Sequence, residues 1–173
     1  MGNNWKITDT LTKVFAEEVP DGQGSIRLST LHRETVSCVI AYFGTADWGR
    51  YWKVSVKAPE KIETRLRRVE LVPSAYPCHK EQDDNYLRIV PGMYPDLLRD
   101  LDTEDDGADK KYLTKEVPGQ WRSLWLDVTV DAELAGGDYA IVIETETEDG
   151  EKETLKADLH VVDASLPPQK LLH

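Results

Sequence analysis

The sequence predicts an all-β fold: an antiparallel β-sandwich of the immunoglobulin-like or jelly-roll-like kind, forming a single domain with little helix. Two observations predict it. Apolar and polar residues alternate with a period of two over seven or eight short segments, as they do in strands that bury one face. Gly, Pro and Asp separate these segments, and the sequence offers no long amphipathic helix of the kind that connects parallel strands.

Length and composition agree with a single folded domain. The chain has 173 residues, of which 40% are hydrophobic and 31% charged, so it can bury a core without disulfides or a metal. We expect residues 25–165 to form the sandwich domain. Residues 1–24 are expected to be an N-terminal extension, and residues 166–173 the start of a linker, because Pro167 and Pro168 cannot donate to a strand ladder.

The predicted strands follow one another closely. In chain order, the alternating segments are residues 25–32, 35–43, 51–59, 64–72, 85–90, 121–130, 137–147 and 152–163. The last two are separated by Glu-Asp-Gly-Glu, and the Asp-Gly pair is typical of a hairpin turn. Helical turns are expected at most in residues 10–19 and 94–102.

Charge limits the partners that the chain can have. Lys and Arg number 21 and Asp and Glu number 32, a net charge of −11, so the averaged field repels phosphate backbones and anionic lipids. We therefore expect no nucleic acid and no membrane as partner. The basic cluster of Arg65, Arg67 and Arg68 alternates as a strand does and is interpreted as a solvated strand face.

With no signal peptide and no apolar run long enough to span a bilayer, a cytoplasmic location is expected.

Neither a metal site nor a cofactor site is predicted. Cys38 lies in an apolar segment, and Cys78 with its neighbour His79 falls short of a four-ligand zinc set. The acidic segment 99–111 fails as an EF-hand, because Leu113 stands where a bidentate Glu is needed. A cation site of another kind in this loop stays open, although a solvated acidic loop is the simpler interpretation. No catalytic motif is found, so no catalytic residue is assigned.

The tryptophans occur in two pairs. Trp48 and Trp52, like Trp121 and Trp125, are four residues apart, which places both members of a pair on one face of a strand. Such residues are mostly core, because each ring buries a large apolar area. The alternative is that these four form an exposed sugar-stacking surface of a carbohydrate-binding module.

Several motifs in order resemble a known family. The segments "HRETVSCVIAY" (32–42), "PGMYPDLLRDL" (91–101), "VPGQWRSLWLDVTVDAELAGGDYAIVIE" (117–144) and "LHVVDASLPPQ" (159–169) resemble the N-terminal β-sandwich that precedes the catalytic barrel in glycoside hydrolase family 123 and its DUF4091-type relatives. The resemblance covers roughly residues 25–173. The chain departs from the family pattern at residues 131–133, where a Pro-Lys turn is usual, and at Met93.

The resemblance implies a non-catalytic accessory domain. Family members are retaining β-N-acetylgalactosaminidases in which the acetamido group of the substrate is the nucleophile, supported by an Asp-Glu pair in a (β/α)8 barrel. That barrel would follow the Leu-Pro exit at residues 166–167, so no catalytic residue is carried over and the chain alone is not expected to be an enzyme. Its expected partner is the catalytic barrel of the same protein, and glycan would be met only through the whole enzyme.

The resemblance also suggests where this domain meets its barrel. We expect the "PGMYPDLL" loop to pack against the barrel and support the rim of the active site, with Pro91, Tyr94, Pro95 and Asp96 as the contact residues. The simpler alternative is that Tyr-Pro-Asp is a turn with a buried Tyr.

Overall fold

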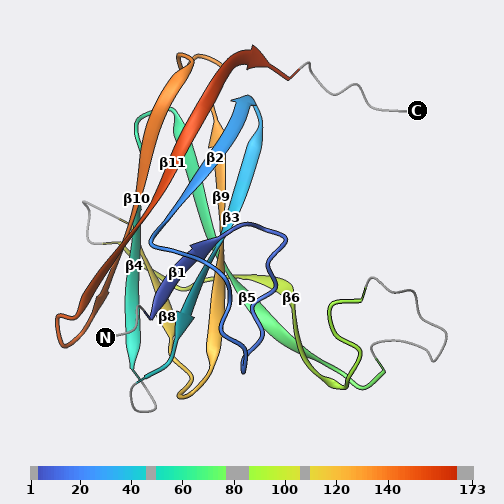
Figure 1. Cartoon of the computed structure of the whole chain (residues 1–173). Coiled ribbons are helices and arrows are strands. Elements are labelled where there is room, and N and C mark those ends of the chain that lie inside the picture. Colours follow the sequence, from blue (N-terminus) through green and yellow to red (C-terminus); the bar gives the residue numbers. More distant parts are fainter. Residues whose placement is uncertain (1–3, 46–49, 77–85, 106–109, 167–173) are drawn as a thin grey trace.

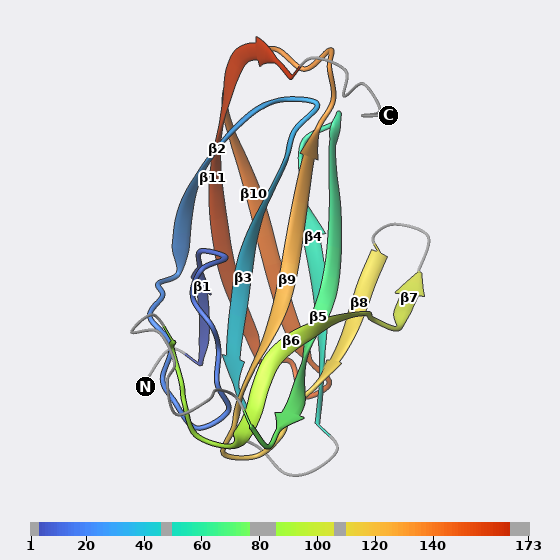
Figure 2. The ribbon, with the colours of Figure 1, turned by 90° about the vertical axis from the view of Figure 1, so that its right-hand side faces the viewer.

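The computed structural model describes residues 4–45, 50–76, 86–105 and 110–166, and no helix forms within them (Figure 1). The strands in chain order are β1 (Trp5–Thr8), β2 (Ser25–His32), β3 (Thr35–Phe43), β4 (Tyr51–Lys57), β5 (Ile62–Ser74), β6 (Gly92–Asp100), β7 (Thr103–Asp105), β8 (Lys110–Lys115), β9 (Trp121–Val130), β10 (Gly137–Thr147) and β11 (Lys152–Ser165). Sheet A has the order β1-β3-β9-β5-β6, and sheet B has the order β2-β11-β10-β4-β8-β7. The two sheets pack face to face (Figure 2), which confirms the predicted β-sandwich.

The main core fills the space between the sheets. Each strand turns alternate side chains inward, so that in β9 Leu124, Leu126 and Val128 are fully buried. The largest fully buried side chains are Trp5, Ile7, Ile40, Tyr42, Trp52, Leu66, Leu124, Leu126, Ile141, Ile143, Leu155 and Leu159. They come from both sheets, so the period-two pattern of the sequence is the pattern of burial.

An aromatic cluster joins the two layers at one end of the core. Trp5 stacks on Tyr42 with ring centroids 4.9 Å apart and meets the edge of Trp52 at 5.2 Å. The polar atoms of these rings are satisfied: the Tyr42 hydroxyl lies 2.7 Å from Thr114 Oγ1, and Trp52 Nε1 donates to Glu116 Oε1 at 2.6 Å. Burial raises the pKa of Tyr42 to about 12, so the hydroxyl stays protonated.

Most of the predicted strands are found where the alternation placed them. The Asp-Gly turn joins β10 to β11, with Gly150 in the left-handed region at φ 82°. Cys38 is a buried free thiol whose pKa burial raises to about 12, as expected of a small core residue.

Several features differ from the sequence-based expectation, among them β7 and β8, which were not predicted as strands. The segment 85–90 forms no strand over its described residues, while residues 92–100, expected as a loop or helical turn, form β6. Pro95 is tolerated there because β6 is an edge strand, whose outer donors have no ladder partner to lose. Leu97 pairs with Glu70 and Pro95 with Leu71, so Asp96 is the additional residue of a β-bulge.

The expected N-terminal extension takes part in the sandwich. Residues 5–8 form β1 and pair with β3, and Trp5 and Ile7 enter the core. Four residues are too short for alternation to indicate a strand.

One strand pair is parallel. β2 runs parallel to β11, whereas the other pairs of named strands are antiparallel. The two strands are far apart in the sequence, so no short turn forces them into opposite directions. The fold is therefore a sandwich of one antiparallel and one mixed sheet.

Candidate functional site

The outer face of sheet A carries a second apolar cluster. Trp121 packs there with Val39 and Ala41, and partly buried Trp125 and Phe43 lie against them. Because these strands already bury their other face in the main core, sheet A is apolar on both sides. Because exposed apolar surface is unfavourable in water, we expect another segment to cover the apolar cluster on this outer face.

The N-terminal segment that follows β1, residues 9–20, supplies this cover. Val14, Phe15 and Ala16 are buried, and Trp121 N donates to Ala16 O at 2.8 Å. Its bend begins at Asp9, whose Oδ1 accepts from the amides of Leu11 and Thr12 at 2.8 and 3.0 Å. The segment crosses the face of the sheet as a strap of irregular backbone, not as the helical turn considered from the sequence.

The same segment is bonded to the residues that lead into β6. Phe15 meets Tyr94 edge to face at 5.7 Å, and the Arg88 guanidinium lies 4.7 Å from the Phe15 ring centroid. Arg88 also forms an ion pair with Glu17, and the hydrogen bond from Arg88 lowers the pKa of that carboxyl. The Tyr94 hydroxyl donates to Val90 O at 2.5 Å. Tyr94 thus fixes the neighbouring backbone and holds the strap.

A polar cluster at Asp127 lies on this outer face beside Trp125. Asp127 Oδ1 accepts from Ser37 Oγ and from Trp125 Nε1, both at 2.7 Å, and Oδ2 pairs with Arg67. Burial alone would raise the pKa of Asp127, but these three donors outweigh it and hold the pKa below its usual value. The carboxylate therefore fixes the indole of Trp125 in one orientation.

A groove of 210 Å³ opens between the strap and β6. Its floor consists of Val39, Val69, Ser123 and Trp125 from the sheet. One wall comes from residues 10–14, and the other from Pro95, Asp96 and Leu98. The structure thus brings two residues predicted as interface contacts beside one tryptophan predicted for sugar stacking.

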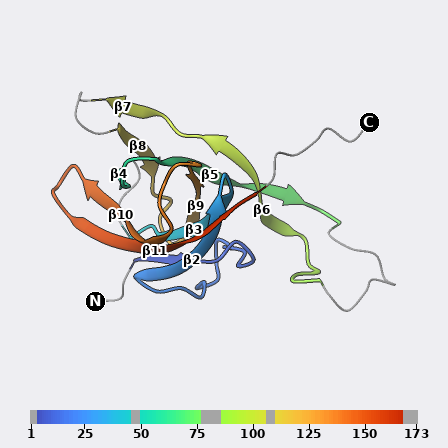
Figure 3. The same cartoon turned by 90° about the horizontal axis from the view of Figure 1, so that it is seen from above.

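A second hollow, of 330 Å³, lies at the start of β6. It is lined by Lys13, Phe15, Ser74, Tyr86, Leu87, Arg88, Tyr94 and Pro95. Residues 86–97 include six exposed large apolar side chains: Tyr86, Leu87, Ile89, Val90, Met93 and Leu97. The first two of these line the hollow. Leu87 is 76% exposed, the highest fraction of the six. We call these six residues the apolar shoulder; with the end of β5 and the start of β6, this region projects beside the two layers (Figures 1 and 3).

The four residues predicted as interface contacts lie at or near the hollow and the groove. Tyr94 and Pro95 line the hollow beside the apolar shoulder, Asp96 faces the groove, and Pro91 is exposed between them. Sequence reasoning missed the shoulder residues 86–90, because their alternation was interpreted as a strand with one buried face.

The tryptophans do not form one exposed surface. Trp52 is 2% exposed in the main core and Trp121 is 6% exposed under the strap, so neither offers a ring face to a sugar. Trp121 and Trp125 do share a face of β9, as predicted, and Trp125 borders the groove. Trp48 lies outside the described residues.

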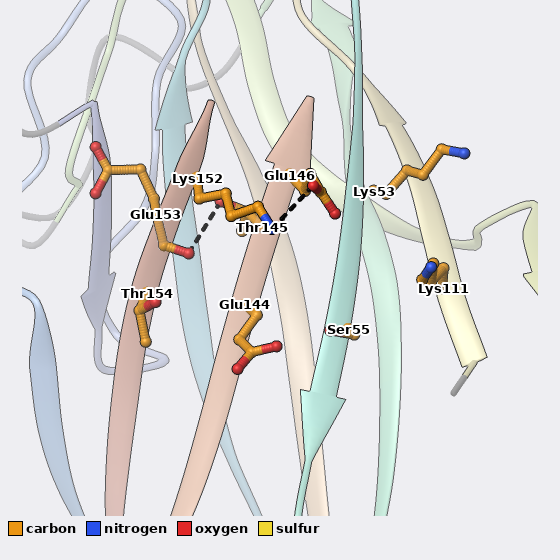
Figure 4. Close-up of a pocket in the computed structure, with 9 residues that line it drawn as sticks. All are labelled: Lys53, Ser55, Lys111, Glu144, Thr145, Glu146, Lys152, Glu153 and Thr154. Atoms are coloured by element: carbon orange, nitrogen blue, oxygen red, sulfur yellow. Dashed lines mark hydrogen bonds and ion pairs between the residues drawn. The ribbon is translucent and has the colours of Figure 1, made fainter. Parts of the chain in front are cut away.

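The outer face of sheet B is charged. This face has a hollow of 340 Å³. The residues that line it, drawn in Figure 4, are Lys53, Ser55, Lys111, Glu144, Thr145, Glu146, Lys152, Glu153 and Thr154. Lys152 Nζ lies 3.0 Å from Glu146 Oε1, and Lys57 pairs with Glu144 at 2.7 Å. Exposed ion pairs of this kind stabilise a fold by about 0–1 kcal/mol each. Each pair combines one positive and one negative charge, so the pairs add no net charge to this face. We interpret this face as solvated.

The basic cluster and the acidic loop are also paired. Arg65 is exposed and binds Asp100 at 2.8 Å, as expected of a solvated strand face. Arg67 and Arg68 differ from that expectation, because both are only partly exposed and pair with Asp127 and Glu70. Part of the acidic loop forms β7, where Glu104 pairs with Lys53 at 2.8 Å. Residues 106–109, Cys78 and the proline pair at 167–168 lie outside the described residues.

Two kinds of feature are absent from the described residues. No three His, Cys, Asp or Glu side chains among them gather as metal ligands would. No helix in this part of the chain is long and apolar enough to cross a membrane.

Comparison with known proteins identifies the fold. No family model and no curated protein matches the sequence. The structure is similar to that of a family 123 glycoside hydrolase from Clostridium perfringens, with a TM-score of 0.64 and 10% identity over 94% of this chain. Weaker similarities include the N-terminal domain of PorA (TM-score 0.44, 7% identity, 93% of this chain and 99% of that chain) and the pilin BcpA of Bacillus cereus (TM-score 0.44, 9% identity, 92% and 40%).

The similarity to the hydrolase is partial in two respects. This chain spans 28% of the length of that enzyme. At 10% identity the likeness concerns the arrangement of the strands alone. The comparisons therefore identify the chain as a β-sandwich with the fold of one part of a family 123 glycoside hydrolase.

Proposed function

We propose that this chain is the non-catalytic accessory sandwich of a glycoside hydrolase of the β-N-acetylgalactosaminidase-like, substrate-assisted type. In this proposal it packs against a catalytic barrel that belongs to the same protein, and it supports that barrel. The apolar shoulder is the observation that carries the proposal. Soluble monomers rarely expose a large contiguous apolar area, and such areas commonly mark interfaces.

The position of the shoulder supports contact with a rigid neighbour. Tyr94 and Pro95, the residues expected at the interface, line the hollow next to Leu87. The strap and β6 hold this region through Phe15 and Arg88, so that the surface is preorganised. The similarity of fold to part of a glycoside hydrolase, over most of this chain, supports the choice of a hydrolase barrel as the proposed partner.

The first test requires a catalytic barrel encoded in the same gene as this chain, which is produced as a separate protein. Leu87→Asp combined with Val90→Asp places two charges in the proposed interface. We expect roughly tenfold or greater weakening when this variant of the sandwich binds the separately produced barrel, because buried unpaired charges oppose association. Calorimetric titration measures the change.

Leu11→Asp is the matched control, because Leu11 is 85% exposed and lies away from the shoulder. It should leave barrel binding unchanged. The proposal fails if the coding sequence holds no barrel domain, or if the shoulder variant binds as tightly as the control. The isolated chain should not hydrolyse chromogenic N-acetyl-β-galactosaminide, and turnover above the blank would also contradict the proposal.

A further inference from the structure

We propose that the groove on the outer face of sheet A binds a single neutral pyranose ring. This site is separate from the apolar shoulder and goes beyond the accessory role proposed above. It combines a fixed aromatic ring, a buried hydroxyl and a carboxylate in 210 Å³. Binding sites of this kind are mostly apolar, with a few polar groups that orient the ligand.

Trp125 is the apolar part of the site. Its Nε1–H is already bound to Asp127 at 2.7 Å, so the indole offers the groove its apolar surface and not a donor. Val39 and Val69 extend this floor on the two neighbouring strands. An aromatic face is electron-rich and attracts the slightly positive C–H groups on the flat side of a sugar ring.

Ser123 supplies the first polar contact. The residue is 3% exposed and lines the groove, yet its hydroxyl has no hydrogen-bond partner among the residues that the structure describes. Because Ser123 lies on the lining of the groove, its hydroxyl is open to a ligand there and can both donate and accept a hydrogen bond. A ligand that reaches the floor with a hydroxyl would satisfy it.

Asp96 supplies the second polar contact. It is the extra residue of the β6 bulge, which turns its exposed side chain to the wall of the groove. Like Ser123, its carboxylate has no hydrogen-bond or ion-pair partner among the described residues. A sugar hydroxyl can donate to this carboxylate while another accepts from Ser123, because a hydroxyl does both.

Size and charge restrict the ligand further. The groove is smaller than the ~300 Å³ at which pockets for drug-sized ligands begin, so it fits one ring and not an oligosaccharide. Lys13 on the opposite wall offsets the charge of Asp96. The wall charges therefore balance, which favours a neutral ligand over an anion.

The experiment is a titration of the ¹⁵N-labelled chain with galactose, glucose and N-acetylgalactosamine, each in turn. We expect the Trp125 indole resonance to shift in a saturable way with at least one sugar, at roughly millimolar affinity. Asp96→Asn and Ser123→Ala should each weaken binding roughly tenfold, because each removes one hydrogen bond to the ligand. The Trp125→Phe variant lacks the Trp125 indole signal, so comparison of its spectrum with that of the unaltered chain assigns this resonance.

Asp100→Asn is the matched control: it alters a carboxylate on the same strand that pairs with Arg65, away from the groove. It should bind like the unaltered chain. The proposal is overturned if none of the sugars shifts the Trp125 resonance, or if the two groove variants bind as the control does. Since the titration needs no barrel, its failure would leave the accessory role standing, and loss of barrel binding would leave the sugar site standing.

Discussion

Asp127 illustrates how one side chain can organise a face of a sheet. It is partly buried, and it accepts hydrogen bonds from Ser37 and Trp125 and pairs with Arg67. These contacts join β3, β9 and β5, the three central strands of sheet A. Removal of the charge therefore affects three strands at once.

Asp127→Asn is expected to destabilise the fold by about 1–3 kcal/mol, because Arg67 loses its charged partner in a partly buried setting. The effect should depend on pH. Since the folded pKa of Asp127 is depressed, its stabilising contribution is present above the unfolded value of about 3.9 and is lost as pH falls through the folded value. Denaturant unfolding at neutral pH and at about pH 3 measures the difference between variant and wild type.

Asp100→Asn serves as the comparison for this residue. The Asp100 side chain is 75% exposed and its pair with Arg65 is a surface one, so the loss should stay within about 1 kcal/mol. A difference for Asp127→Asn that did not shrink in acid would show that the carboxylate contributes through packing and not through its charge.

The roles of single residues on the outer face of sheet A could not be predicted from the sequence. Alternation places Trp121 and Trp125 on one face of a strand, and that prediction is correct. It cannot indicate that Trp121 is covered while Trp125 borders a groove. That difference depends on where the strap crosses the sheet, and the strap has no periodic pattern.

Among the elements, the N-terminal strap has the largest effect on the candidate site. It buries Phe15, bonds its backbone to Trp121 and forms one wall of the groove. A cover without regular structure relies on a few anchoring side chains. Phe15 is the natural place to test it.

Phe15→Ala should destabilise the chain by about 3 kcal/mol, because it removes a buried ring and the contacts with Tyr94 and Arg88. Leu11→Ala in the same strap is 85% exposed before substitution and should change stability by less than about 0.5 kcal/mol. Denaturant unfolding compares the two variants. Equal stabilities would mean that the strap is not anchored through Phe15.

The strands that the sequence predicted well are those in which apolar and polar residues alternate over many positions. β9, β10 and β11 alternate over ten or more residues, and an Asp-Gly turn joins the last two. β6 was missed because Pro95 and the bulge at Asp96 break the alternation, and both features are most common in edge strands. Whether a strand lies at an edge depends on long-range pairing, which local patterns do not contain.

At the scale of the whole molecule, Trp5 connects parts that are distant in the sequence. β1 belongs to sheet A, yet the Trp5 ring contacts Trp52 of sheet B as well as Tyr42 of its own sheet. The beginning of the described chain therefore packs against buried side chains of both sheets. Cooperative unfolding of the sandwich should include it.

Trp5→Ala is expected to cost about 3–5 kcal/mol, the range for removal of a large buried aromatic side chain. The unfolding of this variant, followed by circular dichroism, should remain a single transition at a lower denaturant concentration. Trp5→Phe keeps part of the stacking and should lose less. An unchanged midpoint for Trp5→Ala would show that β1 is not integral to the sandwich.

The bulge and proline of β6 have a consequence for how copies of the chain meet one another. Sheet edges can template the addition of a foreign strand, which leads to fibrils. Here β1 and β7 are only four and three residues long, and β6 is interrupted. Among the edges described, β2 alone is an unbroken run of eight residues, so self-association by strand addition would have to begin there.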